Sequence, residues 1–204
     1  TEWQASTHPP LLRKHIEVMF DGVDCDRLTP NAGASFALPD GRVLRPGDEV
    51  LTFVNRNLEP YRGYHIFMRA LPDILAARPD AQVVIVGGSG NSYNGPPKAG
   101  GTWKDMFLTE VKDRLDLSRV HFVGKISHPR LVDLFHVTRA HAYLTYPFVL
   151  SWSMVETLAA GTEHVPVAQP EIELAELRRR AVRQPRRRLR RGDGEEQEEL
   201  EEHP

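Results

Sequence analysis

The sequence has little of what marks secreted, membrane-spanning or metal-binding proteins. Cys25 is the only cysteine among 204 residues, which excludes an internal disulfide and a thiolate zinc cluster and favours a reducing, cytoplasmic setting. No stretch approaches the roughly 18 consecutive apolar residues that a membrane-spanning helix needs. The first residues lack the basic start and apolar run of a secretory signal. The nine histidines show no metal-ligand spacing, so we expect no metal site.

A global excess of one charge is also missing, because the formal net charge is only −2. Charge is instead segregated near the end of the chain. Nine arginines lie between Arg178 and Arg191, and six glutamates lie between Glu195 and Glu202. Such blocks repel themselves and bury little apolar surface, so residues 169–204 are expected to form a charged tail outside the core. The basic block lacks interleaved aromatic residues, which argues against RNA binding.

The rest of the chain alternates between β-prone runs and amphipathic stretches. The composition, 40% apolar and 26% charged, can build a core. Strands are predicted over residues 50–54, 83–86, 120–123 and 142–145, and helices over residues 64–75, 103–115, 131–135 and 153–160. This order predicts right-handed βαβ units and an α/β, Rossmann-like parallel sheet with helices on both faces.

Three shorter signals lie outside this alternation. Residues 15–20 form a short apolar run that predicts a strand, and Pro39-Asp40-Gly41 predicts a hairpin turn. Residues 165–167 predict a last strand. In parallel sheets, ligands bind beyond the carboxyl ends of the strands. We therefore expect the chemistry in the loops that follow the strands, over residues 55–62, 87–102, 124–128 and 146–153.

Two of these loops have features that suit phosphate. Arg56 and Arg62 lie between the first buried strand and its helix, where helix N–H groups and guanidinium forks favour anions. The alternative is a pair of solvated loop arginines. The run Gly87-Gly88-Ser89-Gly90 follows a strand, but Tyr93 stands where a dinucleotide fingerprint needs its third glycine. NAD binding, and with it a nicotinamide oxidoreductase, is therefore disfavoured.

The loop at residues 146–153 is rich in aromatic and hydroxyl side chains and enters a helix. Ser153 is predicted to be the N-cap of that helix. Glu156 follows at the spacing of a capping box, so a structural role for its carboxylate competes with ligand binding.

Taken in order, these segments resemble the donor-binding C-terminal domain of a GT-B glycosyltransferase of family 4, the group 1 glycosyl transferases. The resemblance runs from about residue 18 to residue 161. It is carried by residues 20–24 (FDGVD), 54–63 (VNRNLEPYRG), 84–87 (VIVG), 120–124 (VHFVG) and 151–161 (SWSMVETLAAG). The order of the five motifs, rather than any one of them, makes the resemblance specific.

The resemblance implies roles for two groups of residues. Arg56 and Arg62 would hold the donor diphosphate, with Arg62 standing where the family usually has lysine. Arginine keeps the positive charge and adds a fork of donors. Gly124, Lys125 and Ile126 would meet the nucleobase, largely through the backbone.

It also implies roles around the last helix. Leu150, Ser151 and Trp152 would lie along the phosphates and sugar, and Glu156 would bind the ribose hydroxyls as the second acid of the family's E-x7-E pattern. The first acid of that pattern falls on Phe148, which changes the usual contact to the donor sugar.

The expected function is therefore that of the donor half of a retaining hexosyltransferase that uses a nucleotide-diphosphate sugar and no cofactor or metal. Residues 1–14 would be the exit segment of a missing N-terminal acceptor domain, and residues 15–168 an incomplete donor domain. We expect the isolated chain to be inactive, the parent protein to be cytoplasmic, with peripheral membrane association open to it, and nucleic acid not to be a partner. The alternative is a non-catalytic nucleotide-binding or assembly module.

The resemblance stops after Gly161, where Thr162-Glu163-His164 leads into the charged tail. We hypothesise a changed reading frame or an artificial end at this point. Translation of the other two frames of the DNA tests this hypothesis, because a family-like continuation should appear in one of them.

Overall fold

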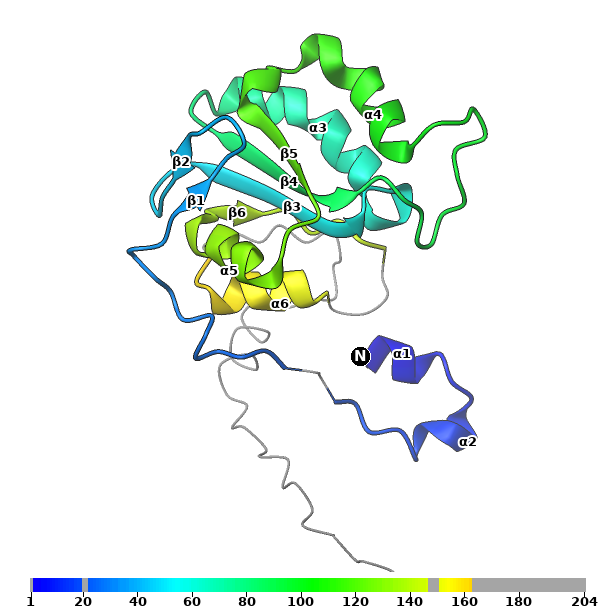
Figure 1. The fold of residues 1–204 in the computed structure, drawn as a ribbon. Helices are drawn as coiled ribbons and strands as arrows, with labels where there is room; N and C mark the ends of the chain where they lie inside the picture. Colours follow the sequence, from blue (N-terminus) through cyan, green and yellow to red (C-terminus); the bar gives the residue numbers. More distant parts are fainter. Residues whose placement is uncertain (1, 20–21, 147–150, 163–204) are drawn as a thin grey trace, which may run out of the picture.

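The computed structural model describes residues 2–19, 22–146 and 151–162. Its centre is a four-stranded parallel sheet in the order β5-β4-β3-β6 (Figure 1). The strands are β3 (Val50–Asn57), β4 (Gln82–Gly88), β5 (Val120–Gly124) and β6 (Ala140–His141). The predicted Rossmann-like α/β fold is confirmed, with all four strands ending at the same edge.

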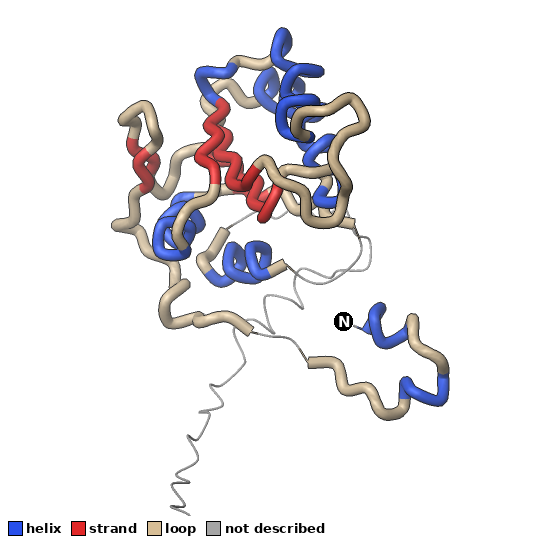
Figure 2. The backbone as a smooth tube through the Cα atoms, turned by 45° about the vertical axis from the view of Figure 1, so that its right-hand side comes forward, coloured by secondary structure: helices blue, strands red, loops and turns tan. Residues whose placement is uncertain are grey.

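Helices cover both faces of this sheet (Figures 1 and 2). On one face lie α3 (Tyr64–Ala77) and α4 (Trp103–Val111), and on the other α5 (His128–Val137) and α6 (Trp152–Ala159). Side chains alternate along each strand, so Phe53 packs towards α3 and α4 while its neighbour Val54 packs towards α5. Burial on both faces explains why the strands are uninterrupted apolar runs in the sequence.

Smaller elements surround the sheet. The predicted hairpin is present: β1 (Phe36–Ala37) pairs with β2 (Val43–Leu44) in antiparallel fashion. Two short helices, α1 (Glu2–Ser6) and α2 (Pro10–Arg13), bury no residues and lie apart from the sheet in Figure 1. No helix in the described ranges is long and apolar enough to cross a membrane.

Several predicted boundaries are wrong. Residues 15–19 form no strand, and Met19 is 71% exposed, because this apolar run has no neighbouring strand to pair with. Helix α4 ends at Val111, before a separate 3-10 turn, η2 (Lys112–Arg114). Strand β3 runs on to Asn57, so Arg56 belongs to the strand rather than to a loop.

The last described strand also differs from its prediction. The extended ladder lies at β6, ahead of the predicted residues 142–145, and Leu51 pairs with Ala140 and Thr52 with His141. His141 is fully buried there, and its Nδ1 lies 2.9 Å from the Thr52 hydroxyl. The predicted strand at residues 165–167 and the charged tail lie outside the described residues.

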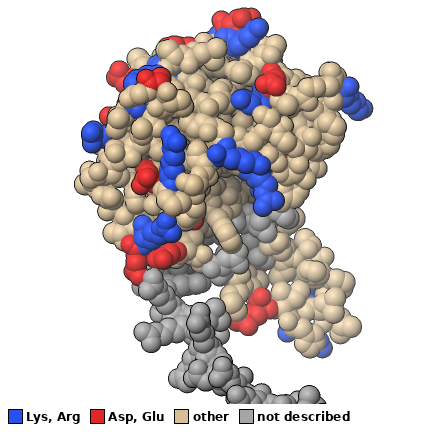
Figure 3. Space-filling view, viewed as in Figure 1, with Lys and Arg blue, Asp and Glu red and all other residues tan. Residues whose placement is uncertain are grey.

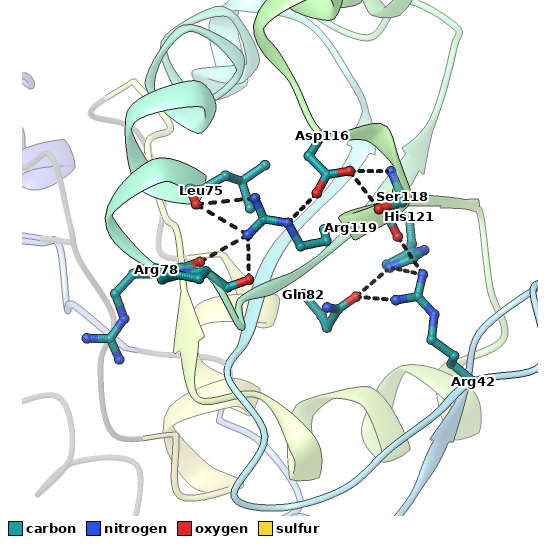
Figure 4. Close-up of polar contacts among 9 residues, drawn as sticks. Arg42, Leu75, Arg78, Gln82, Asp116, Ser118, Arg119 and His121 are labelled. Carbon is teal, nitrogen blue, oxygen red and sulfur yellow. Dashed lines mark hydrogen bonds and ion pairs between the residues drawn. The ribbon is translucent and has the colours of Figure 1, made fainter.

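The amino edge of the sheet carries a network of arginine contacts (Figure 4). Arg119, in the 3-10 turn η3 (Leu117–Arg119), donates to the carbonyl oxygens of Leu75, Arg78 and Pro79 at distances of 2.9–3.3 Å. Its Nε also donates to the Asp116 carboxylate at 2.7 Å. Arg119 therefore satisfies carbonyl groups at the end of α3 that the helix itself leaves unpaired.

Charged side chains are interspersed over the face shown in Figure 3, with lysine and arginine lying among aspartate and glutamate. Ion pairs at the protein surface include Arg69 with Glu110 and Arg78 with Glu49. Pairs of this kind contribute little to stability because water screens them.

Candidate donor site

Three chain segments that are far apart in the sequence meet at the carboxyl edge of the sheet. The Leu58 N–H donates to the Gly88 carbonyl oxygen at 2.9 Å, which joins the ends of β3 and β4. The Tyr146 N–H donates to the Tyr61 carbonyl oxygen at 3.1 Å, which brings in the segment after β6. The structure thus places three of the four predicted loops side by side.

Arg62 is held in place at this edge. Its Nη1 donates to the Thr145 hydroxyl at 3.1 Å, and its guanidinium carbon lies 4.8 Å from the centre of the Tyr93 ring. Arg62 ends the 3-10 turn η1 (Pro60–Arg62), and Gly63 follows with φ +74° at the start of α3. A Cβ on Gly63 would lie 2.3 Å from the Leu144 carbonyl oxygen, so only glycine allows this close approach. The guanidinium is therefore held by two contacts, on a residue that directly precedes the N-cap of α3.

Arg56 behaves differently although it lies on the same edge. It is exposed near the end of β3, and the described part of the chain offers its guanidinium no hydrogen bond or ion pair. The two arginines therefore share an edge of the sheet, but only one of them is oriented by protein contacts.

A buried carboxylate that no sequence pattern indicates supports the carboxyl edge of the sheet. Glu59 is 0% exposed, and its two oxygens accept from the backbone N–H groups of Ser92, Tyr93 and Asn94 at 3.0–3.3 Å. The Asn94 side chain in turn accepts from the Tyr61 N–H at 2.8 Å. Glu59 therefore fixes the loop after β4 against the start of α3.

This anchoring sets up a row of aromatic rings. Tyr61 lies between Tyr93 and Tyr146, with ring centres 5.1 Å and 5.6 Å apart. The outer two rings are 52% and 66% exposed. Because Arg62 lies over Tyr93, the cation and the aromatic row form one surface.

The residues predicted to meet the nucleobase lie at the end of β5 and in the loop that follows it. Gly124 is exposed with φ +68°, and a Cβ placed there would meet no atom within 4 Å. The Lys125 side chain crosses Gly88, where an added Cβ would come within 2.6 Å of its Cε. The Ile126 side chain is partly buried and packs against the core.

Helix α6 begins one residue before the predicted range, which changes the roles of two residues. Ser151, not Ser153, stands at the N-cap position, and its side chain makes no capping hydrogen bond. Glu156 is therefore the fifth residue of the helix, too far along for a capping box. The capping interpretation was wrong because a hydroxyl residue occurs at both positions.

Glu156 is instead engaged across the space between two helices. Its side chain is 10% exposed, and its Oε1 accepts from the Nε2 of His128, the first residue of α5, at 2.7 Å. The contact joins the loop after β5 to α6. Sequence reasoning missed His128, because nothing in the spacing of two residues that are 28 positions apart indicates contact.

The remaining predicted residues lie at the entry to α6. The Ser151 N–H donates to the Tyr143 hydroxyl at 3.1 Å, and the Ser151 hydroxyl lies 2.7 Å from that of Ser153. Burial raises the pKa of Tyr143, so this phenol stays protonated at neutral pH. Trp152 is 64% exposed. Leu150 and Phe148 lie outside the described residues.

Across residues 2–19, 22–146 and 151–162, no group of three or more histidine, cysteine, aspartate or glutamate side chains is arranged to hold an ion.

Solved structures share this fold. The C-terminal domain of a glycosyl transferase group 1 family protein, LpcC from Francisella tularensis, superposes with a TM-score of 0.55 at 12% identity, covering 78% of this chain and 85% of that one. TarM from S. aureus, solved with fondaparinux, alpha-GlcNAc-glycerol and UDP, gives a TM-score of 0.53 at 14% identity. That match covers 82% of this chain but 28% of TarM, so the chain spans under a third of TarM's length. No curated protein matches the chain.

A parallel sheet with helices on both faces, superposable on these structures, gives the chain a Rossmann-like fold of the GT-B type. The sequence narrows the class. Residues 39–168, more than half of the chain, match the family described as glycosyl transferases group 1, and the chain belongs to this family.

Proposed function

We propose that the chain is the donor-binding part of a retaining hexosyltransferase, and that it binds a nucleotide-diphosphate sugar at the carboxyl edge of its sheet. The orientation of Arg62 carries this proposal. Its guanidinium is held by Thr145 and Tyr93, on the residue just before Gly63, the N-cap of α3, at the edge where parallel sheets bind ligands. UDP in the TarM structure, a protein of the same fold, is consistent with this type of donor.

The other residues are assigned around that point. Arg56 joins Arg62 on the diphosphate, and Gly124, Lys125 and Ile126 meet the nucleobase. The open space above Gly124 supports this part of the proposal. The contacts along the phosphates, the donor sugar and the ribose are assigned to Leu150, Ser151, Trp152 and Glu156.

In this proposal, the arginines stabilise the diphosphate as it leaves. Charge builds up on the leaving phosphate oxygens as the glycosidic bond breaks, and fixed cations in a partly dried site stabilise that charge. Arg62 needs no reorientation for this role, because its neighbours already hold it. No metal or cofactor is invoked.

We further propose that residues 15–168 form the donor domain, that residues 1–14 lead into it from an acceptor domain, and that residues 169–204 lie outside it. Transfer requires the acceptor to be held against the donor in one cleft. The isolated chain should therefore bind the donor without turnover. We place the parent protein in the cytoplasm because Cys25 is the only cysteine among these 204 residues, so no disulfide can form within them.

The test is calorimetry of the chain with UDP, GDP, ADP and NAD. One of the three diphosphates should bind, more tightly than its monophosphate, and NAD should not. Arg62→Ala should weaken diphosphate binding by about ten-fold, the value of one charge-assisted contact. Arg78→Ala is the matched control, because Arg78 is an exposed arginine that pairs with Glu49 far from this edge.

Two results decide between the proposals. Unchanged diphosphate affinity in a folded Arg62→Ala variant would remove the donor-site assignment. Diphosphate binding by the chain, combined with no transfer by the full-length parent, would favour the non-catalytic nucleotide-binding module.

A further inference from the structure

The contact between Glu156 and His128 uses only one of the two oxygens of the Glu156 carboxylate. Oε1 accepts from His128 Nε2 at 2.7 Å, and Oε2 has no hydrogen-bond partner in the described part of the chain. Oε2 is not one of the fully buried side-chain atoms without a partner, so a ligand can still reach it. A carboxylate with one oxygen fixed and one open can accept a hydrogen bond from a ligand hydroxyl.

The two residues come from different structural elements. Glu156 lies in α6, where it is the only charged residue, and is 8% exposed as a whole residue. His128 is the first residue of α5 and follows the loop that begins at Gly124. Their hydrogen bond therefore ties the loop assigned to the nucleobase to the helix assigned to the ribose.

We propose that His128 is a positioning residue that orients the Glu156 carboxylate for the ribose hydroxyls. This inference rests on the proposed function, because it concerns the same nucleotide. An ionised carboxylate can only accept, so Nε2 carries the proton in this contact. With Oε1 held, the carboxylate no longer has to be ordered when the nucleotide binds, and Oε2 faces the ligand at a lower entropic cost.

A purely structural role for the same contact makes a different prediction. If His128 only ties α5 to α6, its removal lowers stability and weakens all nucleotides alike. If it positions Glu156 for ribose, its removal acts on the hydroxyl that Glu156 binds. The preference for a ribonucleotide over its 2′-deoxy counterpart is therefore the readout that a merely structural contact would not move.

The experiment uses the whole chain and the tightest binder among UDP, GDP and ADP, beside the 2′-deoxy form of the same diphosphate. His128→Ala should weaken the ribonucleotide by about five- to ten-fold and the deoxynucleotide by less than about two-fold. His128→Gln, whose amide can still donate to Oε1, should keep most of the preference. Asp133→Ala, an exposed substitution on the same helix, is the matched control and should change neither affinity. If His128→Ala does not fold, His128→Leu takes its place with the same expectation.

Three outcomes overturn the inference. The first is a full ribose preference in His128→Ala while Glu156→Gln loses it, which leaves the proposed function intact. The second is an equal loss for both nucleotides in His128→Ala, with no rescue by His128→Gln, which would make the contact structural. The third is that no diphosphate binds the folded wild-type chain, which removes the proposed function and this inference together.

Discussion

At the amino edge of the sheet, Arg119 donates to three carbonyl oxygens and a carboxylate, whereas at the carboxyl edge Arg62 meets one hydroxyl and one aromatic face. Arg56, on the same edge as Arg62, has no described partner. The same residue type therefore completes backbone hydrogen bonding at one end of the sheet and keeps donors available at the other. An arginine whose donors are already used stabilises the fold, while one with spare donors can bind an anion.

Glu59 should give the largest effect, because it is a structural residue at the edge assigned to binding. Glu59→Ala removes the acceptor for three backbone N–H groups, and each orphaned donor costs about 1–3 kcal/mol. We expect the free energy of unfolding in urea to fall by about 3 kcal/mol or more.

Glu59→Gln keeps one carbonyl acceptor, so its free energy of unfolding should lie between those of the wild type and Glu59→Ala. Glu110→Ala, which removes an exposed glutamate paired with Arg69, is the matched control and should change little. A Glu59→Ala variant as stable as the wild type would show that the loop after β4 does not depend on this carboxylate.

Arg119 tests the structural side of the comparison. Arg119→Ala removes the donor to the Leu75 and Pro79 carbonyl oxygens, whereas the Arg78 carbonyl oxygen still accepts from the Ala81 N–H. The Arg119 side chain is only 18% exposed. We expect a loss of about 2–3 kcal/mol in urea unfolding. Diphosphate affinity should not change in the folded fraction.

Arg78→Ala provides the comparison variant here, because Arg78 lies in the same region but directs its exposed side chain to the half-buried Glu49. Its effect on stability should be clearly smaller. Equal effects of the two substitutions would mean that the carbonyl contacts of Arg119 add nothing beyond a surface ion pair.

Between the two edges lies a buried group that titrates. Burial lowers the pKa of His141 from its ordinary 6.5 to about 3. Between these values, the unfolded chain binds a proton that the folded chain excludes, so stability falls as the pH falls below 6.5. The contribution amounts to about 2 kcal/mol at pH 5 relative to neutral pH.

Urea unfolding at pH 7 and pH 5 measures this loss. His141→Asn, whose amide can still meet Thr52, removes the titration and should reduce the difference between the two pH values. The histidines at 65 and 121, whose pKa values are also lowered by burial, remain in both proteins, so the comparison isolates His141. An unchanged difference would mean that His141 takes up a proton equally readily in the folded and the unfolded chain.

Much of this fold follows from local pattern. Strands such as β3 and β4 could be predicted because burial on both faces requires an unbroken apolar run, and α3 because its apolar residues recur on one face. Strand β6 could not be placed correctly, since His141 fits a buried position only through the Thr52 hydroxyl of a neighbouring strand.

The candidate site also contains residues that could be predicted from the sequence and one that could not. Arg56 and Arg62 could be placed at the carboxyl edge because parallel topology puts the end of every strand there. Glu59 could not be found, because its partners are backbone N–H groups 33–35 residues further along the chain. Almost every residue type has a backbone N–H group, so the residues at positions 92–94 give no sign in the sequence of a contact with Glu59. The order of strands and helices, by contrast, can be predicted from the sequence.

The smallest expected effect belongs to Arg56. Because Arg56 is exposed and has no described partner, Arg56→Ala should leave the stability of the fold within about 0.5 kcal/mol of the wild type.

The contribution of Arg56 to diphosphate binding should also be smaller than that of Arg62, since an arginine without partners loses side-chain entropy when it closes on an anion. We expect calorimetry to give about a three-fold loss of affinity, against about ten-fold for Arg62→Ala. The loss should shrink with added salt, because an exposed charge is screened. If Arg56→Ala binds the diphosphate as tightly as the wild type at low salt, Arg56 is a solvated strand residue. Arg62 is then the one arginine of this pair that binds an anion at the carboxyl edge.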